Sequence, residues 1–173
     1  PALDRAAERF EGLAARYVAD GVENAADGAA QAAIGRIRLT SDLAEAAASA
    51  DLIIEAVPEN LELKQGIYRT LADAAPATTI FATNSSTLLP SALAESTGRP
   101  DRFLALHFAN EIWSHNTAEV MGTPATDPAV YDAMVEFATR IGMVPIQIKK
   151  EKAGYLLNSL LVPFLQAGAE LLV

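Results

Sequence analysis

Asp51-Leu-Ile-Ile-Glu-Ala-Val57 decides the fold, because a nearly continuous apolar run of this length is typical of a buried parallel strand. A second such run, Thr79-Ile-Phe-Ala-Thr83, follows a segment with helical periodicity at residues 61–75. Strands that alternate with helices predict βαβ units and a mainly parallel sheet. The fold class is therefore α/β, with helices flanking the sheet.

The rest of the chain continues this alternation. Strands are predicted over residues 36–39, 102–108, 118–121 and 145–149. Helices are predicted over residues 3–19, 25–34, 43–49, 90–96 and 127–141, and from Gly154 onward. The first two helices resemble an insertion ahead of the sheet.

The composition indicates a globular protein: the 173 residues are 51% hydrophobic and 20% charged. No apolar run reaches the ~18 residues that span a bilayer, so the chain is expected to be soluble. It has no cysteine, which excludes disulfides and thiolate metal sites and fits a reducing compartment such as the cytoplasm. Its net charge of −9 repels polyanions, so nucleic acid is not expected as a partner, and without a long apolar run neither is a membrane.

Both ends of the chain are informative. The start carries no Met, and Asp4, Glu8 and Glu11 exclude a secretory signal peptide. No Gly-x-Gly-x-x-Gly turn is present, so either the fold binds no dinucleotide or its first βαβ unit is absent. Residues 160–173 are helical and apolar, and we expect them to pack on further chain or on a partner.

Polar residues follow the predicted strands at the edge where open α/β sheets bind ligands. After the first two strands these residues are Glu59, Asn60, Lys64, Asn84, Ser85 and Ser86. At the third strand they are His107 and Asn110, and Glu119 lies in the strand that follows. We expect these side chains to converge on one crevice.

His107 lies in an otherwise apolar strand, Phe103-Leu-Ala-Leu-His-Phe108. A histidine side chain ordinarily has a pKa of about 6.5, which allows proton exchange at neutral pH, and a carboxylate such as Glu119 could hold the tautomer of His107. A hydrogen-bonded core histidine without a catalytic role is the alternative, which spacing alone favours.

The other polar positions also have structural alternatives. The triplet at residues 84–86 is typical of a helix N-cap or Asx-turn. Glu59 and Lys64 could be solvated residues on a first helical turn, and Asn158 could bond a neighbouring helix. His115 lies in a polar loop and is expected at the surface.

Four stretches together resemble the 3-hydroxyacyl-CoA dehydrogenase family: DLIIEAVPENLELK (51–64), ATNSSTL (82–88), LHFANEIWSHNTAEVMG (106–122) and GYLLNSLLVP (154–163). The resemblance covers essentially the whole chain and agrees in order and spacing. It implies a Rossmann-like NAD-binding domain over residues 1–150 that lacks its first βαβ unit, followed by the start of a helical C-terminal domain over residues 151–173. It also implies NAD as cofactor, an acyl-CoA substrate and a homodimer formed through the helical region.

The resemblance implies a role for each matched residue in oxidising a short-chain 3-hydroxyacyl-CoA to the 3-oxoacyl-CoA. His107 would be the general base and Glu119 its carboxylate partner, while Ser86 and Asn158 would hold substrate oxygens. The cofactor contacts implied are Ala56, Glu59, Lys64, Asn84 and Asn110. Metal ligands are not expected.

The sequence departs from the family pattern in two places. His107-Phe-Ala-Asn-Glu111 stands where the family usually has His-Phe-Phe-Asn-Pro, as in a short-chain hydroxybutyryl-CoA variant, and this leaves chain-length preference open. Ala153-Gly154 replaces the usual Pro-Gly. Without the glycine-rich turn the pyrophosphate lacks its helix N-terminus, so residues 1–173 alone are expected to bind NAD poorly and to be inactive.

Three other interpretations remain open from the sequence. Dehydrogenases of the carnitine or gulonate type share the architecture and the His–Glu pair. A degenerate binding module would keep the fold without turnover, but the retained Ser86, His107, Glu119 and Asn158 argue against it. A generic interaction domain explains none of these residues. NAD and NADP are not distinguished, because the acidic residue after the second strand is absent.

Overall fold

The computed structural model describes residues 2–172 and divides the chain into two compact units, residues 1–46 and 47–173. The first unit contains α1 (Ala2–Ala19), the π-helical turn η1 (Ala25–Ala29) and α2 (Ala30–Ile34). The single helix predicted over residues 25–34 is interrupted, because Gly28 adopts φ 87° and Asp27 is also non-helical. Glycine takes this left-handed conformation without the steric penalty of a side chain.

The strand predicted over residues 36–39 is wrong, since this segment is irregular. Ile37 and Leu39 are 43% and 37% exposed, and the segment has no place in the five-stranded sheet of the described residues. A strand needs a neighbour to satisfy its backbone hydrogen bonds, and local sequence does not reveal whether one is available.

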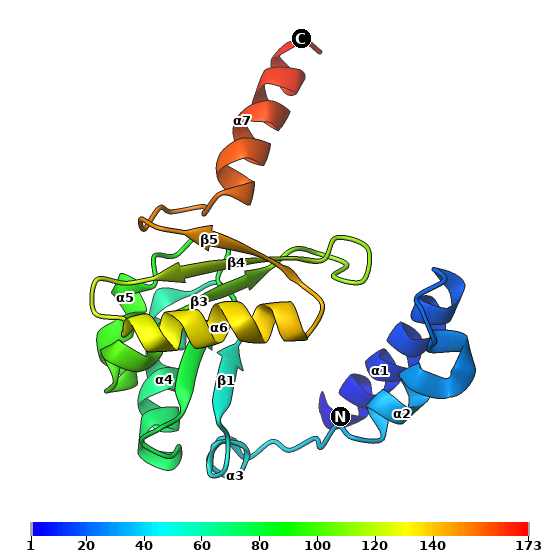
Figure 1. Cartoon of the computed structure of the whole chain (residues 1–173), viewed down its shortest axis with the longest axis horizontal. Coiled ribbons are helices and arrows are strands. Elements are labelled where there is room, and N and C mark those ends of the chain that lie inside the picture. Colours follow the sequence, from blue (N-terminus) through cyan, green and yellow to red (C-terminus); the bar gives the residue numbers. More distant parts are fainter. Residues whose placement is uncertain (1, 173) are drawn as a thin grey trace. The chain divides into compact units, whose positions relative to one another are not determined.

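The short helix α3 (Leu43–Ala47) spans the boundary between the two units. The elements after it form a sheet with helices (Figure 1). In chain order they are β1 (Leu52–Glu55), α4 (Leu61–Ala74), β2 (Ile80–Thr83), α5 (Ser91–Ala94), the 3-10 turns η2 (Glu95–Thr97) and η3 (Pro100–Arg102), β3 (Phe103–Phe108), β4 (Thr117–Gly122), α6 (Pro128–Arg140), β5 (Val144–Ile148) and α7 (Leu157–Glu170). The strand order is β1-β2-β3-β4-β5, with only the β3–β4 pair antiparallel. The predicted α/β class is confirmed.

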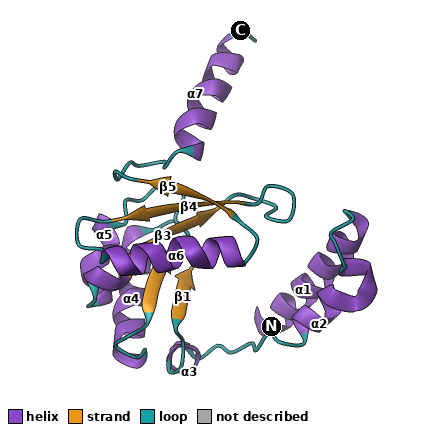
Figure 2. Ribbon diagram, in the orientation of Figure 1, coloured by secondary structure: helices purple, strands orange, loops and turns teal. Residues whose placement is uncertain are grey.

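Alternating side chains divide the core between the two faces of the sheet. Phe81 and Phe103 pack with Tyr68 of α4 on one face. Leu104 and Leu106, one residue out of phase, pack against α6 on the other face. Figure 2 shows α6 alongside the strands of the sheet. His107 follows Phe103 by four residues, so it shares the α4 face.

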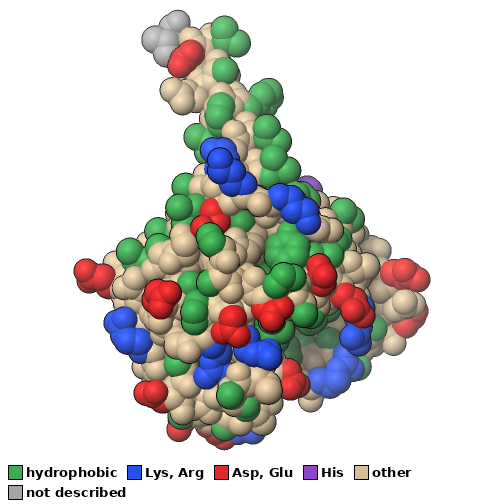
Figure 3. Space-filling view, turned by 60° about the vertical axis from the view of Figure 1, so that its left-hand side comes forward, with side chains coloured by type: hydrophobic (Ala, Val, Ile, Leu, Met, Phe, Trp, Pro, Cys, Tyr) green, Lys and Arg blue, Asp and Glu red, His purple; other side chains and the backbone are tan. Residues whose placement is uncertain are grey.

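Exposed apolar side chains lie on β1 and along α7. The run at residues 51–57 was expected to be buried, yet Ile54 is 37% exposed because β1 is an edge strand of this sheet. Along α7 apolar side chains lie exposed, including Leu160 at 64% and Phe164 at 75% (Figure 3). Within residues 2–172, no helix combines the length and apolarity needed to cross a membrane. The predicted domain boundary at residue 150 stays a prediction.

Candidate active site

His107 and Glu119 meet on neighbouring antiparallel strands. The register of β3 and β4 pairs the two residues directly, which places both side chains on the same face of the sheet. His107 Nδ1 lies 2.7 Å from Glu119 Oε2. His107 is 8% exposed and Glu119 is fully buried, so the contact is shielded from solvent. The contact expected from the sequence is present; its catalytic role stays a prediction.

The second oxygen of Glu119 holds the beginning of α7. Glu119 Oε1 accepts hydrogen bonds from the backbone N–H groups of Leu156, at 2.7 Å, and Leu157, at 2.9 Å. Burial raises the pKa of Glu119, but the hydrogen bonds from His107, Leu157 and Leu156 outweigh it and lower the pKa. The carboxylate therefore stays ionised beside both the imidazole and the positive end of a helix.

Tyr155 packs against the imidazole, a contact that the sequence did not reveal. Its ring centroid lies 5.2 Å from that of His107, and its hydroxyl donates to the Leu88 carbonyl at 3.1 Å. Tyr155 is 1% exposed and has a left-handed φ of 52°. A tyrosine before an apolar helix carries no sequence signal for such a position.

Ser86 and Asn158 come together although 72 residues separate them. Asn158 Nδ2 donates to the Ser86 carbonyl oxygen at 3.1 Å. Both residues are half-buried. The alternative of a helix-to-helix bond for Asn158 is wrong, because its amide reaches the turn after β2.

Glu59 holds the other side of the same turn. Glu59 Oε1 accepts from Ser85 Oγ at 2.5 Å, Ser86 N at 3.2 Å, Thr87 N at 3.0 Å and Thr87 Oγ1 at 2.8 Å. Burial raises its pKa, but the hydrogen bonds from Ser85, Thr87 and Lys64 outweigh this and lower the pKa to about 2. The Glu59 side chain is 37% exposed. Its hydrogen bonds to the turn nevertheless make it more than a solvated surface residue.

Lys64 is buried beneath Glu59. Its side chain is 1% exposed, and its ammonium lies 2.7 Å from Glu55 Oε1, 3.3 Å from Glu59 Oε2 and 3.1 Å from the Val57 carbonyl. The alternative of a solvated lysine is therefore wrong. Its implied contact with the cofactor stays a prediction.

The other candidate residues lie at or near the same edge. Asn84 Oδ1 accepts from Phe108 N at 3.0 Å, which ties the end of β2 to the end of β3. Asn60 caps α4 by accepting from Leu63 N at 2.9 Å. Ala56, Asn110 and His115 are exposed, the last as predicted. Ser85 Oγ accepts from Leu88 N at 3.0 Å, so the turn-forming alternative for residues 84–86 describes this serine.

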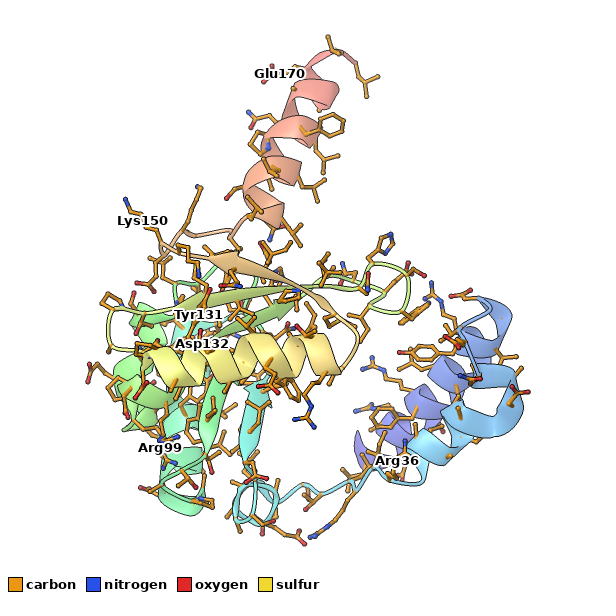
Figure 4. The ribbon with its side chains drawn as sticks, in the orientation of Figure 1. Arg36, Arg99, Tyr131, Asp132, Lys150 and Glu170 are labelled. Carbon is orange, nitrogen blue, oxygen red and sulfur yellow. The ribbon has the colours of Figure 1, made fainter. Side chains whose placement is uncertain are left out.

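A separate groove of about 580 Å³ opens where β4 and β5 end. Tyr131 and Asp132 of α6 and Lys150 after β5 line it (Figure 4). Because β4 runs antiparallel to β3, Gly122 at this groove pairs with Leu104 and not with the His107 end of the strand. The groove is therefore distinct from the His107–Glu119 site.

The carboxyl ends of β1–β3 suit part of a dinucleotide. Glu59, Asn84 and Ser86 supply carboxylate, amide and hydroxyl oxygens there, the groups that bind a hydroxyl-rich ribose and a carboxamide. In residues 2–172 no cluster of His, Cys, Asp or Glu could hold a metal ion. Groups of these kinds can bind the nicotinamide–ribose half of NAD, and the contact of each with the cofactor stays a prediction.

The family model described as "3-hydroxyacyl-CoA dehydrogenase, NAD binding domain" matches residues 1–152. The chain belongs to the 3-hydroxyacyl-CoA dehydrogenase family. NAD is accordingly the cofactor of this domain, and the resemblance drawn from the four sequence motifs is confirmed.

Three relatives illustrate the range of this family. Hydroxyacyl-coenzyme A dehydrogenase, mitochondrial, from Homo sapiens is 36% identical over 80% of this chain and 44% of its own length. The 3-hydroxybutyryl-CoA dehydrogenase of Clostridioides difficile is 33% identical over 66% of this chain and 41% of its own. A solved diketoreductase structure is 68% identical, with a TM-score of 0.95 over 99% of this chain and 60% of its own. The chain thus spans less than half the length of the two curated relatives.

Proposed function

We propose that the complete protein carrying this chain interconverts short-chain 3-hydroxyacyl-CoA and 3-oxoacyl-CoA with NAD. The observation that supports this most directly is the buried His107–Glu119 contact at 2.7 Å, at the sheet edge that also carries Ser86. A reaction that creates or consumes an alcohol needs a proton acceptor of this kind.

The residues of the chain have separate tasks in this proposal. Bound NAD would supply the acceptor for the hydride of C3. His107 takes the proton of the 3-hydroxyl through Nε2, because Nδ1 faces Glu119. The Glu119 carboxylate stabilises the imidazolium that results. Ser86 and Asn158 orient the substrate oxygens. Glu59, Asn84 and Asn110 would hold the nicotinamide ribose, with Lys64 and the Ala56 backbone beside it.

The test is reduction of acetoacetyl-CoA by the complete protein, followed by loss of NADH absorbance. We expect turnover that requires NADH and rises with acetoacetyl-CoA until it saturates. Absence of turnover with acetoacetyl-CoA and longer 3-oxoacyl-CoA thioesters would contradict the proposal.

A second candidate is the reduction of free dicarbonyl compounds, which the 68% identity to a diketoreductase favours. A 3-oxoacyl thioester is itself a dicarbonyl compound, so the same proton donor could serve either substrate. Comparing kcat/KM for acetoacetyl-CoA with that for acetylacetone separates the two candidates. A preference for 3-dehydrocarnitine over both would favour the carnitine-type alternative.

We also propose that the exposed apolar side of α7 is covered in a homodimer of the complete protein. Leu160, Phe164 and Leu165 are 64%, 75% and 57% exposed, more apolar surface than a helix normally leaves in water. Sedimentation of the complete protein tests this, and a strict monomer would contradict it. A cytoplasmic location stays a prediction, while the human relative is described as mitochondrial.

A further inference from the structure

Glu55 is a buried carboxylate at the end of β1 that the proposed chemistry does not use. It is 4% exposed. Its Oε1 accepts from Lys64 Nζ and Val57 N, both at 2.7 Å. Its Oε2 accepts from Thr83 Oγ1 at 2.9 Å and from Tyr68 OH at 3.3 Å. A charge is stable in such a place only when every polar contact is made, as it is here.

The contacts of Glu55 lead through Lys64 to Glu59. Lys64 lies between the two carboxylates, 2.7 Å from Glu55 Oε1 and 3.3 Å from Glu59 Oε2. The ammonium therefore joins the two carboxylates in one chain of contacts that starts at the end of β1. Because Lys64 is 1% exposed, water cannot replace either carboxylate as its partner.

The chain of contacts ends on the backbone of Ser86. Glu59 accepts from the N–H groups of Ser86 and Thr87, while Asn158 donates to the Ser86 carbonyl. Ser86 is thus held both through its backbone N–H and through its backbone carbonyl. The place of its hydroxyl depends on Glu59, and the place of Glu59 depends on the ammonium that Glu55 fixes from below.

We propose that Glu55 is a positioning residue that sets the location of Ser86 through Lys64 and Glu59. This rests on the proposed function only in the role given to the Ser86 hydroxyl. Without the Glu55 charge, Lys64 has Glu59 as its one carboxylate partner in the network. The ammonium then moves toward Glu59. Glu59 shifts with it, and the turn at residues 84–87 is no longer held in its position at the end of β2.

The test compares Glu55→Gln with Glu62→Gln in the complete protein. Both substitutions remove one negative charge at nearly constant size, but Glu62 is exposed on the first turn of α4. Amide hydrogen exchange without cofactor and steady-state kinetics with acetoacetyl-CoA and NADH are the two measurements.

Glu55→Gln is expected to lower kcat by about tenfold to a hundredfold, since a small misplacement of an orienting group acts on the reacting geometry. The amides of Ser86 and Thr87 should exchange faster, and Glu62→Gln should change neither quantity. A Glu55→Gln protein with wild-type exchange at both amides would overturn the proposal.

Glu55→Gln removes one charged partner of the buried Lys64, and the variant could fail to fold for that reason alone. A second variant keeps the proposal testable in that case. Glu55→Gln with Lys64→Met removes both buried charges, a change that such pairs often tolerate. The double variant should fold and still show faster exchange at Ser86 and Thr87; unchanged exchange there would also overturn the proposal. Exchange in the cofactor-free protein needs no substrate, so it tests Glu55 even where acetoacetyl-CoA is not turned over.

Discussion

Glu119 holds His107 through one carboxylate oxygen, at 2.7 Å, and uses the other to bind the first backbone N–H groups of α7. The orientation of the imidazole and the docking of the helix thus depend on one buried charge. Asn158, the second residue of α7, reaches the Ser86 carbonyl because the helix begins at that point.

Glu119→Gln should lower kcat by about a hundredfold or more, because an amide cannot stabilise the imidazolium and can hold the wrong tautomer of His107. Steady-state rates with acetoacetyl-CoA and NADH measure this. Glu136→Gln, an exposed change of the same type on α6, is the control. A Glu119→Gln enzyme within about twofold of wild type would exclude the proposed pair.

The Glu59 carboxylate should contribute acid-sensitive stability. Its pKa is lowered from an ordinary 4.5 to about 2 in the folded protein, so the unfolded chain takes up this proton first as the pH falls. The contribution is present above pH 4.5 and is lost between pH 4.5 and about 2.

Urea unfolding of wild type and Glu59→Gln across this pH window measures the contribution. The difference in free energy of unfolding between the two proteins should shrink toward the acid end. Taking the difference removes the parallel effect of Glu119, whose pKa is also lowered. A difference independent of pH would refute the assignment of the low pKa to Glu59.

Asn158→Ala should reduce the free energy of unfolding by about 0.5–1.5 kcal/mol through loss of its hydrogen bond to Ser86. It should also lower kcat/KM, because the amide links α7 to the turn that carries Ser86. Gln166→Ala, exposed on the same helix, controls for helix propensity. Equal kcat/KM in the two variants would show that the link has no functional weight.

Two glycines should respond oppositely to alanine. At Gly122 an added Cβ would lie 3.3 Å from Tyr131 Cδ2, so Gly122→Ala should destabilise by about 1 kcal/mol. Gly66 lies inside α4 with nothing within 4 Å of its added Cβ, so Gly66→Ala should stabilise by about 1 kcal/mol. Thermal unfolding measures both, and a shared sign would contradict the packing described.

Residues 1–173 alone should bind NAD weakly and show no turnover. Glu59, Asn84 and Ser86 can serve the nicotinamide ribose, but the chain has no glycine-rich turn for the pyrophosphate. Isothermal titration is the measurement, with the complete protein as control. A micromolar dissociation constant for residues 1–173 would contradict this expectation.

Periodicity in the sequence predicted most elements, because an apolar stripe or run must be buried wherever the chain goes. It failed where the outcome depended on a neighbour or on one torsion angle. Residues 36–39 have strand-like composition without a pairing strand, and Gly28 breaks a helix by its φ of 87°. One contact of the network does have a signal in the sequence. Glu55 is a carboxylate within an apolar run, and a buried carboxylate requires hydrogen-bonding partners.

The sequence by itself determined the α/β class, the family motifs and the residue types available for chemistry, since these follow from local pattern and spacing. Only the tertiary structure decided that Glu119 also holds Leu156, that Tyr155 packs on His107, and that Glu55 reaches the turn at Ser86 through Lys64 and Glu59. These contacts join segments from different elements, and their geometry depends on how the strands and helices pack, which no local pattern encodes.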